Sequence, residues 1–460
     1  MLWFLVLSAV AGTAAEAPAA EPAVYTLEAN QNVWDMAATD LNLDGIKDIL
    51  LLTNDEKAFP LCKEVAAYLA DASGAYPAQP ACRLALPVET GAVFLAEVAG
   101  GPPVEVVAAH GAGAVVFQFS GSAFAEFGRA EFDSLFPTNS REPSFIKQGA
   151  LDLNGDGIDE WLIPTALGLR VRTLAGDIAT VPCDVVSEMR SGDSLYIVNR
   201  LPDFQTFDAQ GESLKGLAFL SDEFADFAWG DGWANQKRVR LPMNLEEKWD
   251  ATAVMKDITG DGFPDLVVTQ TRGTVRMYAE THVYLAREPF VYSETPDAVF
   301  PCSGAVSSPM VMDVNGDKLL DLVFIRIPFG VGNIVNFFVR GKISVRAEVH
   351  LFDGKQYREK PDYSTGMTMD APEGRSRVAY TFGDFSGDGR IDVAYGSESD
   401  TLAVFTGDPE RFISSRPWQK FTMPSFGNAR AYDLNGNKAE DILLIRPGSD
   451  KAKRADVIVF

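Results

Sequence analysis

A nine-residue acidic motif recurs six times in this chain, each time directly before a short apolar run. It has Asp at position one, Asn, Thr or Ser at position three, Asp or Asn at position five, and Asp at position nine, replaced once by Glu. Apolar runs bounded by turn-forming residues are typical of buried strands, so each copy is expected to join two strands. The copies occupy residues 40–48, 152–160, 257–265, 313–321, 384–392 and 433–441.

The spacing of the motif suits calcium. Ca²⁺ takes six to eight oxygens at about 2.3–2.6 Å, and a tight loop offers oxygens from alternate residues. Side chains at positions one, three and five, a backbone carbonyl at seven and the acid at nine would form such a set. The predicted metal ligands are Asp40, Asn42, Asp44, Asp48, Asp152, Asn154, Asp156, Glu160, Asp257, Thr259, Asp261, Asp265, Asp313, Asn315, Asp317, Asp321, Asp384, Ser386, Asp388, Asp392, Asp433, Asn435, Asn437 and Asp441.

The motif differs from an EF-hand loop, which begins in the same way. An EF-hand needs a bidentate Glu at position twelve and flanking helices. Position twelve here is apolar or aromatic in every copy, and it holds Leu51, Ile163, Val268, Phe324, Tyr395 and Leu444. The loops are therefore not EF-hands.

Position six separates four strong copies from two weaker ones. Glycine at this position allows a positive φ, where a side chain costs roughly 1–2 kcal/mol. Lys318 and Lys438 occupy the position in two copies, and Asn437 also replaces the acid at position five. The loops at 313–321 and 433–441 are therefore expected to bind calcium most weakly.

The intervals between copies indicate a ring of repeats. Two intervals are about twice as long as the others, and degenerate copies at 97–105 and 208–216 fill them without a full ligand set. Eight motifs roughly fifty residues apart, with several strands each, predict an all-β propeller. The segment 22–460 is expected to form this single domain, with an insertion at about 325–383.

The ends of the repeat array favour closure of the ring. A short strand, Val24–Leu27, precedes the first loop, and strands are expected at about 441–446 and 455–460 after the last one. An N-terminal strand that completes the last blade would remove two exposed edges.

These loops resemble the FG-GAP or VCBS repeats of integrin α-subunit propellers and of many bacterial secreted proteins. The resemblance covers roughly residues 22–460, although the Phe-Gly signature survives only in fragments such as Phe382–Gly383. It implies a β-propeller with calcium loops between the first two strands of blades. Members of the family are usually seven-bladed, whereas the motif count here favours eight blades and leaves seven as the alternative.

The net charge of the chain limits its partners, and its first residues indicate the cellular compartment. A net charge of −24 disfavours nucleic acid and anionic membranes as partners, and six bound Ca²⁺ ions would halve it. Residues 1–20 are interpreted as a signal peptide and leader, because Leu2–Leu7 forms an apolar core and Gly12–Ala15 supplies small residues for cleavage. That core is too short for a transmembrane anchor, so a secreted or periplasmic protein is expected.

Four cysteines are too few for a disulfide framework in a chain of this length. Cys62 and Cys82 could pair in an oxidising compartment, and the sequence leaves that open. Cys183 and Cys302 are expected to be buried as small apolar residues.

Two segments are candidates for special surfaces. Residues 327–339 are uncharged and are followed by Arg340, Lys342 and Arg346. They are interpreted either as an amphipathic docking segment or, preferably, as a helix packed on its own blade before an alternating strand. The aromatic residues of 224–233 indicate either sugar stacking or, more commonly, a wedge between blades.

Catalytic motifs are scarce. His110, His282 and His350 fall in separate repeats, and the sequence has no metalloprotease, nucleophile-elbow or phosphate-loop motif. A pair of acids for glycoside hydrolysis would leave no local signature. The sequence therefore predicts a calcium-binding, non-enzymatic scaffold for a protein partner. A glycan-binding lectin is the alternative, and a polysaccharide-active enzyme is less favoured.

Overall fold

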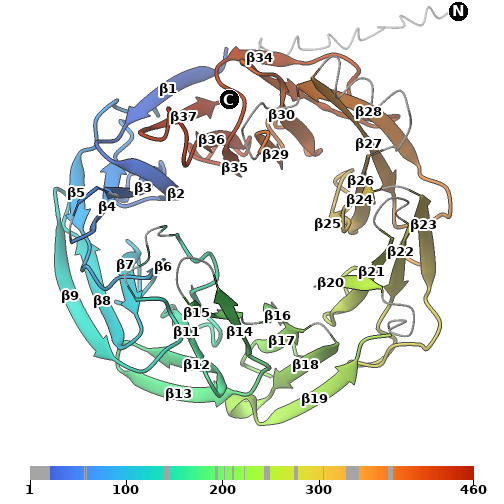
Figure 1. Cartoon of the computed structure of the whole chain (residues 1–460), viewed down its shortest axis with the longest axis horizontal. Helices are drawn as coiled ribbons and strands as arrows, with labels where there is room; N and C mark the ends of the chain where they lie inside the picture. Colours follow the sequence, from blue (N-terminus) through green and yellow to red (C-terminus); the bar gives the residue numbers. More distant parts are fainter. Residues whose placement is uncertain are drawn as a thin grey trace, which may run out of the picture.

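The structure is a computed structural model in which the strands form a ring around a central opening (Figure 1). It describes residues 21–55, 57–58, 60–138, 140, 142, 144–191, 195–200, 202–209, 212–221, 223–242, 249–273, 278–303, 305–327, 341–370 and 377–460. The predicted signal peptide at 1–20 lies outside the described residues, and so does the apolar part of the insertion from 328 onward with Arg340.

Within the described residues, the sheets form eight antiparallel blades, and the first strand of each blade borders the opening. Blade 1 contains β2 (Asn32–Thr39), β3 (Asp48–Asp55), β4 (Cys62–Tyr68) and β5 (Cys82–Ala85). Blade 2 contains β6 (Ala92–Ala96), β7 (Glu105–His110), β8 (Gly113–Phe119) and β9 (Phe124–Glu131). Blade 3 contains β10 (Ala150–Leu151), β11 (Glu160–Thr165), β12 (Gly168–Thr173) and β13 (Gly176–Val181). Blade 4 contains β16 (Asp203–Phe207), β17 (Gly216–Leu220), β18 (Phe224–Trp229) and β19 (Asn235–Arg240).

The second half of the ring repeats this order. Blade 5 contains β20 (Asp250–Lys256), β21 (Asp265–Arg272), β22 (Tyr278–Tyr284) and β23 (Ala298–Ser303). Blade 6 contains β24 (Ala305–Val306), β25 (Met310–Met312), β26 (Asp321–Ile327), β27 (Lys342–His350) and β28 (Tyr363–Asp370). Blade 7 contains β29 (Tyr380–Gly383), β30 (Asp392–Glu398), β31 (Thr401–Phe405) and β34 (Gln419–Thr422). Blade 8 contains β35 (Asn428–Tyr432), β36 (Asp441–Ile445), β37 (Arg454–Val459) and β1 (Ala23–Glu28).

Two hairpins lie outside the four-stranded pattern. One is formed by β14 (Val186–Ser191) and β15 (Leu195–Arg200) between blades 3 and 4. The other is formed by β32 (Gly407–Asp408) and β33 (Phe412–Ile413) within blade 7. The first hairpin was not predicted, because its residues carry no acidic motif.

The core lies between the blades. The second strand of a blade is covered on both faces: all five residues of β36 are buried, and seven of the eight in β3. Such a strand contains the apolar run that follows the acidic motif. Third strands alternate more. In β27, Val345, Ala347 and Val349 are buried whereas Arg346 is exposed, which confirms the predicted alternating strand after the insertion.

The ring is closed by strands from opposite ends of the chain. β1 pairs with β37 in antiparallel register, from Ala23 opposite Val459 to Glu28 opposite Arg454. The prediction that an N-terminal strand completes the last blade is confirmed. This pairing covers the edge of β37 that would otherwise be exposed.

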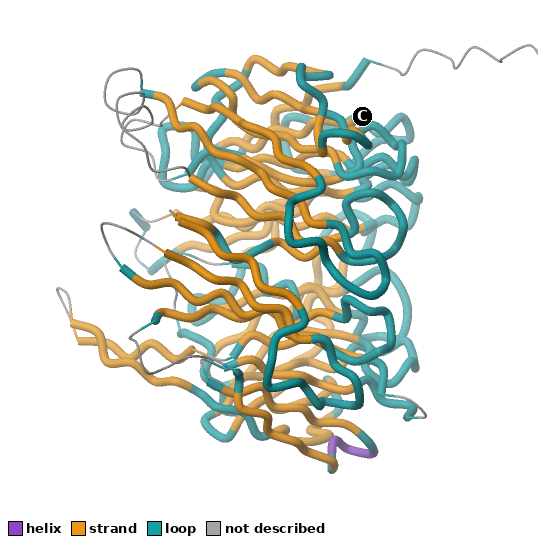
Figure 2. The backbone as a smooth tube through the Cα atoms, turned by 90° about the vertical axis from the view of Figure 1, so that its right-hand side faces the viewer, coloured by secondary structure: helices purple, strands orange, loops and turns teal. Residues whose placement is uncertain are grey.

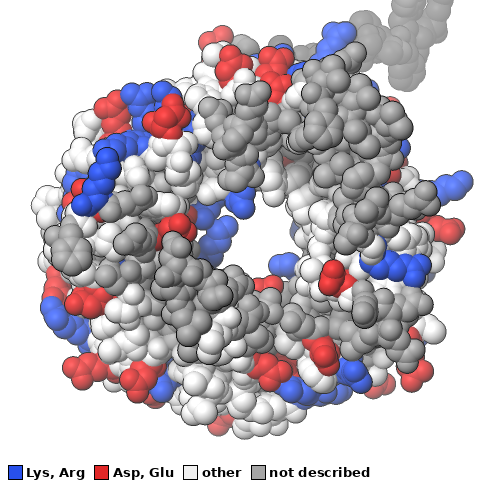
Figure 3. All heavy atoms as spheres, in the orientation of Figure 1, with Lys and Arg blue, Asp and Glu red and all other residues white. Residues whose placement is uncertain are grey.

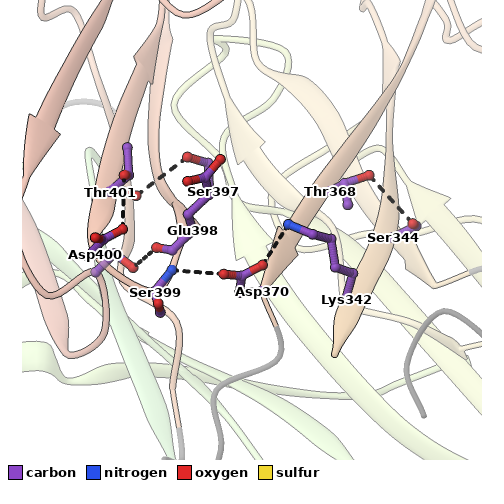
Figure 4. Close-up of polar contacts among 10 residues, drawn as sticks. Lys342, Ser344, Thr368, Asp370, Ser397, Glu398, Ser399, Asp400 and Thr401 are labelled. Carbon is purple, nitrogen blue, oxygen red and sulfur yellow. Dashed lines mark hydrogen bonds and ion pairs between the residues drawn. The ribbon is translucent and has the colours of Figure 1, made fainter. Parts of the chain in front are cut away.

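Polar contacts join blade 6 to blade 7 (Figure 4). Asp370, at the end of β28, accepts a hydrogen bond from the amide of Ser399 at 3.0 Å and lies 2.7 Å from the Lys342 ammonium. Ser399 belongs to the turn between β30 and β31. Part of the predicted basic spot, Lys342, is therefore ion-paired within the ring.

The cysteines do not form the disulfide that the sequence left open. All four are free thiols. Cys82 lies opposite Ala67 in the pairing of β4 with β5, five residues along β4 from Cys62. At about 3.4 Å per residue this separation is too long for a disulfide. Cys302 is buried as expected, whereas Cys183 is only half-buried.

The described part of the chain contains no helix that is both long and apolar enough to span a membrane.

Candidate metal-binding loops

All six acidic loops connect the first strand of a blade to the second, as predicted. Because antiparallel strands alternate in direction, these connections emerge on one face of the ring, which we call the acidic face. It is the right-hand side of the tube in Figure 2. The degenerate copies at 97–105 and 208–216 make the same connection in blades 2 and 4.

Each acidic loop turns through two residues with positive φ. Position six has φ between 70° and 91°, and the two lysines, Lys318 and Lys438, adopt 70° and 76° there. Position four has φ between 62° and 80°, and only Leu43 is not glycine. The turn at position six was predicted from the sequence, whereas the one at position four was not, although five of the six copies carry a glycine there.

The acid at position one organises the loop backbone. In blade 5, Asp257 accepts hydrogen bonds from the amides of Gly260 at 2.7 Å, Asp261 at 3.1 Å and Gly262 at 2.9 Å. The side chain at position five then accepts the amide of position seven, as Asp261 does from Phe263 at 2.9 Å. Side chains that accept nearby backbone amides stabilise such turns without any metal.

The acid at position nine has a role that the sequence analysis did not predict. Asp265 is fully buried, and its Oδ2 accepts the amides of Ile258 and Thr259 at 2.8 and 3.1 Å. Its Oδ1 accepts the amide of Ala286, just beyond the third strand, at 2.7 Å. The carboxylate thus joins the loop to the end of the third strand, which lies beside the start of the second strand.

Four other copies repeat this bridge between the loop and the residue beyond the third strand or near its end. The acids are Asp48, which accepts Leu41 and Ala70, Asp321, which accepts Val314 and Phe352, Asp392, which accepts Ser386 and Gly407, and Asp441, which accepts Leu434 and Phe460. Glu160 accepts the Leu153 amide at 2.8 Å and the Asn154 side chain at 2.9 Å. Burial raises the pKa of Asp265 to about 7 and those of Asp48, Asp321, Asp392 and Asp441 to about 6.

The two degenerate loops differ from each other in the residue at position nine. Glu105 is fully buried and accepts the Val98 amide at 2.9 Å, so it keeps the structural part of the motif. In blade 4, Gly216 stands at position nine, and a Cβ there would lie 2.2 Å from the ring of Phe207. An aromatic side chain fills the space that the carboxylate occupies elsewhere.

The predicted ligands are brought together only in part. Neighbouring ligands at positions three and five touch in three loops, where the Asn amide donates to the Asp, for example from Asn42 to Asp44 at 3.0 Å. No group of three Asp, Glu, His or Cys side chains converges as a metal cluster anywhere in the described ranges. Two predicted ligands, the hydroxyls of Thr259 and Ser386, are buried oxygens without a hydrogen-bond partner among the described residues.

At five of the eight junctions between blades, neighbouring loops are hydrogen-bonded to one another within the described residues, mostly from the amide at position eight. Lys47 donates to the Leu434 carbonyl at 2.7 Å, which joins blade 1 to blade 8. Glu440 and Asp384 exchange two bonds between blades 8 and 7, at 2.8 and 2.9 Å. Similar bonds run from Asp159 to Glu97, from Lys215 to Leu153 and from Ile391 to Val314. We call this set of contacts the loop belt.

The aromatic segment at 224–233 packs between blades. Trp233 is buried, and its indole N–H donates to the Lys215 carbonyl at 3.0 Å. Phe227 is stacked on Phe290 at 4.2 Å, and Trp229 lies 4.8 Å from the same ring. These contacts support the wedge interpretation, and they leave Trp233 unavailable for stacking on a sugar.

The fold and these loops define an eight-bladed β-propeller with repeated acidic turns. Residues 257–324 match the family model described as FG-GAP-like repeat, a stretch that runs from the acidic loop of blade 5 into β26 of blade 6. This match and the eight-bladed fold support an FG-GAP repeat β-propeller, in agreement with the repeat resemblance found in the sequence. A search of curated proteins found no match.

Several solved structures are similar to this chain. One is the V. cholerae biofilm matrix protein Bap1, with 11% identity, coverage of 94% of this chain and 88% of that one, and a TM-score of 0.38. Another is BBS1N in complex with ARL6DN, with 8% identity, coverage of 95% of both chains and a TM-score of 0.40. A third is the Photorhabdus luminescens Tc holotoxin pore, with 14% identity, coverage of 90% of this chain and 17% of that one, and a TM-score of 0.30.

Proposed function

We propose that this propeller is an extracytoplasmic, calcium-stabilised scaffold that binds a protein partner and has no enzymatic activity of its own. The observation that carries the proposal is the repetition of one loop geometry in six blades, always on the acidic face. A single turn of this kind is explained by backbone preferences alone. Six copies that keep oxygen-bearing side chains at positions one, three and five indicate a shared ligand.

The residues fit calcium as that ligand. They offer carboxylate, amide and hydroxyl oxygens, which are the hard donors that Ca²⁺ prefers. The buried Thr259 hydroxyl lacks a partner among the described residues, and an ion would satisfy it. Carboxylate oxygens that already accept an amide keep further acceptor capacity, so the hydrogen bonds of Asp257 and Asp265 do not prevent binding.

In each loop, the side chains at positions one, three, five and nine would hold the ion together with the carbonyl at position seven. Bound calcium would supply a fixed positive charge among three acids, or two in the loop at 433–441, and cross-link the loop. Lys318 and Lys438 add a positive charge at position six, so the loops of blades 6 and 8 are expected to be the weaker sites.

The calcium part is tested by thermal unfolding in millimolar calcium and in chelator. Extracellular modules bind calcium at about 10⁻⁴–10⁻³ M, so each occupied site should add on the order of 1 kcal/mol. Asp261→Ala and Asp388→Ala should each reduce the gain. Asp450→Ala is the matched control, because Asp450 is an exposed acid outside the loops. Identical melting of the wild type with and without chelator would refute calcium stabilisation.

The scaffold part is tested by capture. The protein is immobilised in millimolar calcium, exposed to an envelope extract and eluted with chelator, and the eluate is analysed for polypeptide and glycan. One enriched polypeptide that is absent with Asp261→Ala would support the scaffold. An enriched glycan would favour the lectin alternative, and an empty eluate would limit calcium to holding the blades together.

A further inference from the structure

Blade 3 has an unusually short first strand, and a cavity opens beside it. β10 contains only Ala150 and Leu151, paired with Trp161 and Glu160 of β11. A cavity of roughly 760 Å³ reaches from β11 and β12 to β16 and β17 of blade 4 and to β20 of blade 5. Since β16 and β20 are first strands, this cavity lies on the side of the central opening.

The wall of this cavity is mostly apolar. Leu162, Leu169 and Phe219 are buried side chains of blades 3 and 4, and Met255 contributes from blade 5. Phe204 of β16 lies beside Phe219, with ring centroids 6.2 Å apart. Cavities of a few hundred to about 1,000 Å³ with apolar walls and few polar groups are typical of small-molecule sites.

The polar groups in the cavity are mainly hydrogen-bond donors. Lys147 and Lys256 line it, and neither ammonium has an ion pair or hydrogen bond among the described residues. The Gln205 amide nitrogen also lines it and is buried without a partner in the described part of the chain. Among the described lining residues Asp203 is the one acid, and it is exposed.

This local balance is opposite to that of the whole protein, whose net charge is −24. Figure 3 shows Lys and Arg side chains in blue on the wall of the central opening. Two lysines with no acidic partner cost little free energy of folding while their ammonium groups face water. They would bind an anion through charge-assisted hydrogen bonds. A buried amide N–H without an acceptor also favours a ligand that brings an oxygen.

We propose that this cavity binds a small amphipathic carboxylate. The apolar body of the ligand would lie against Leu162, Phe204 and Phe219, and its carboxylate would accept hydrogen bonds from Lys147 and Lys256. Gln205 would donate to an oxygen of the same ligand. This site is separate from the acidic loops and is independent of the proposed calcium.

The test is calorimetric titration of the full chain with decanoate, kept below its micelle concentration. Decanol and decyltrimethylammonium are the comparison probes, since they keep the chain but remove or reverse the charge. We expect saturable binding of decanoate and binding at least about tenfold weaker for the other two. No saturable binding of decanoate, or equal binding of the cationic probe, would overturn the proposal.

Variants locate the site. The double variant Lys147→Ala with Lys256→Ala should weaken decanoate binding at least about tenfold, and Gln205→Leu should weaken it further. Both lysines are exposed, so the double variant should fold, which its melting curve verifies. Lys420→Ala, an exposed lysine on the outer strand of blade 7, should bind decanoate like the wild type. Unchanged affinity in the double variant would place the binding elsewhere and contradict the proposal.

Discussion

The loops of blades 2 and 5 occupy equivalent positions, yet only one has a full set of oxygen ligands. Residues 97–105 have Ala at position three and Gly at position five, whereas residues 257–265 have Thr and Asp. Both keep a fully buried acid at position nine that accepts the amide of position two, at 2.9 Å in Glu105 and 2.8 Å in Asp265. The motif therefore combines a structural acid at nine with ligand positions that a blade can lose.

The largest effect is expected from Asp265→Ala. The change leaves the buried amides of Ile258, Thr259 and Ala286 without their acceptor, and each such group costs about 1–3 kcal/mol. The free energy of unfolding in urea should fall by about 4 kcal/mol in chelator as well as in calcium. Asp261→Ala serves as the control, and a similar small loss for both variants in chelator would show that position nine acts only through metal.

Glu105→Ala tests the same role in a loop without the ligand set. The Val98 amide and the Gln118 side chain lose their acceptor, so a loss of about 2 kcal/mol is expected. The calcium-dependent gain in melting temperature should equal that of the wild type. A smaller gain would mean that the loop of blade 2 takes part in calcium binding after all.

His350 is expected to make the stability of the protein depend on pH. Burial lowers the pKa of His350, which packs on Phe300 at 4.4 Å. Below pH about 6.5 the unfolded chain then binds a proton that the folded chain does not. The free energy of unfolding therefore decreases as the pH is lowered, by at most about 1.4 kcal/mol per pH unit. His350→Gln should reduce this decline between pH 7.5 and 5.5.

The raised pKa of Asp265 acts with the opposite sign, because the folded chain binds the proton more readily. Only the difference between the wild type and His350→Gln, measured at each pH in chelator, therefore isolates the histidine. Parallel curves would show that His350 does not contribute.

The smallest effect is expected from Lys318→Gly. Lys318 has a φ of 70°, a conformation that glycine adopts without steric cost. The gain should be about 0.5–1 kcal/mol, and the calcium response of blade 6 should increase because a nearby positive charge is removed. Lys420→Gly, in a strand, should instead destabilise the protein, and a loss of stability in Lys318→Gly would contradict the strain argument.

The eight-bladed architecture could be predicted because the motif is local. Nine consecutive residues contain the turn and the start of the next strand, so the spacing of copies located the connection between the first two strands in every blade. Closure by β1 was also predictable, because an unpaired strand at each end of the array requires a partner.

What the sequence did not reveal depends on contacts between distant residues. Asp265 bonds to Ala286, 21 residues away, so its structural role has no local signature. The register that separates Cys62 from Cys82 depends on how β4 and β5 align. The wedge between blades was the preferred interpretation of the aromatic segment, but the bond from Trp233 to the Lys215 carbonyl has no local signature. The cavity beside β10 is lined by residues of blades 3, 4 and 5, which are far apart in the sequence, so it leaves no motif.

The loop belt affects how the ring would come apart. In an open array of repeats, the two end units have one neighbour each, and unfolding can begin there. The bond from Lys47 to Leu434 joins the first blade to the last, so every blade of the described ring has a neighbour on both sides. Losing one blade must break two junctions at once, and unfolding is therefore expected to be a single cooperative event with no frayed end.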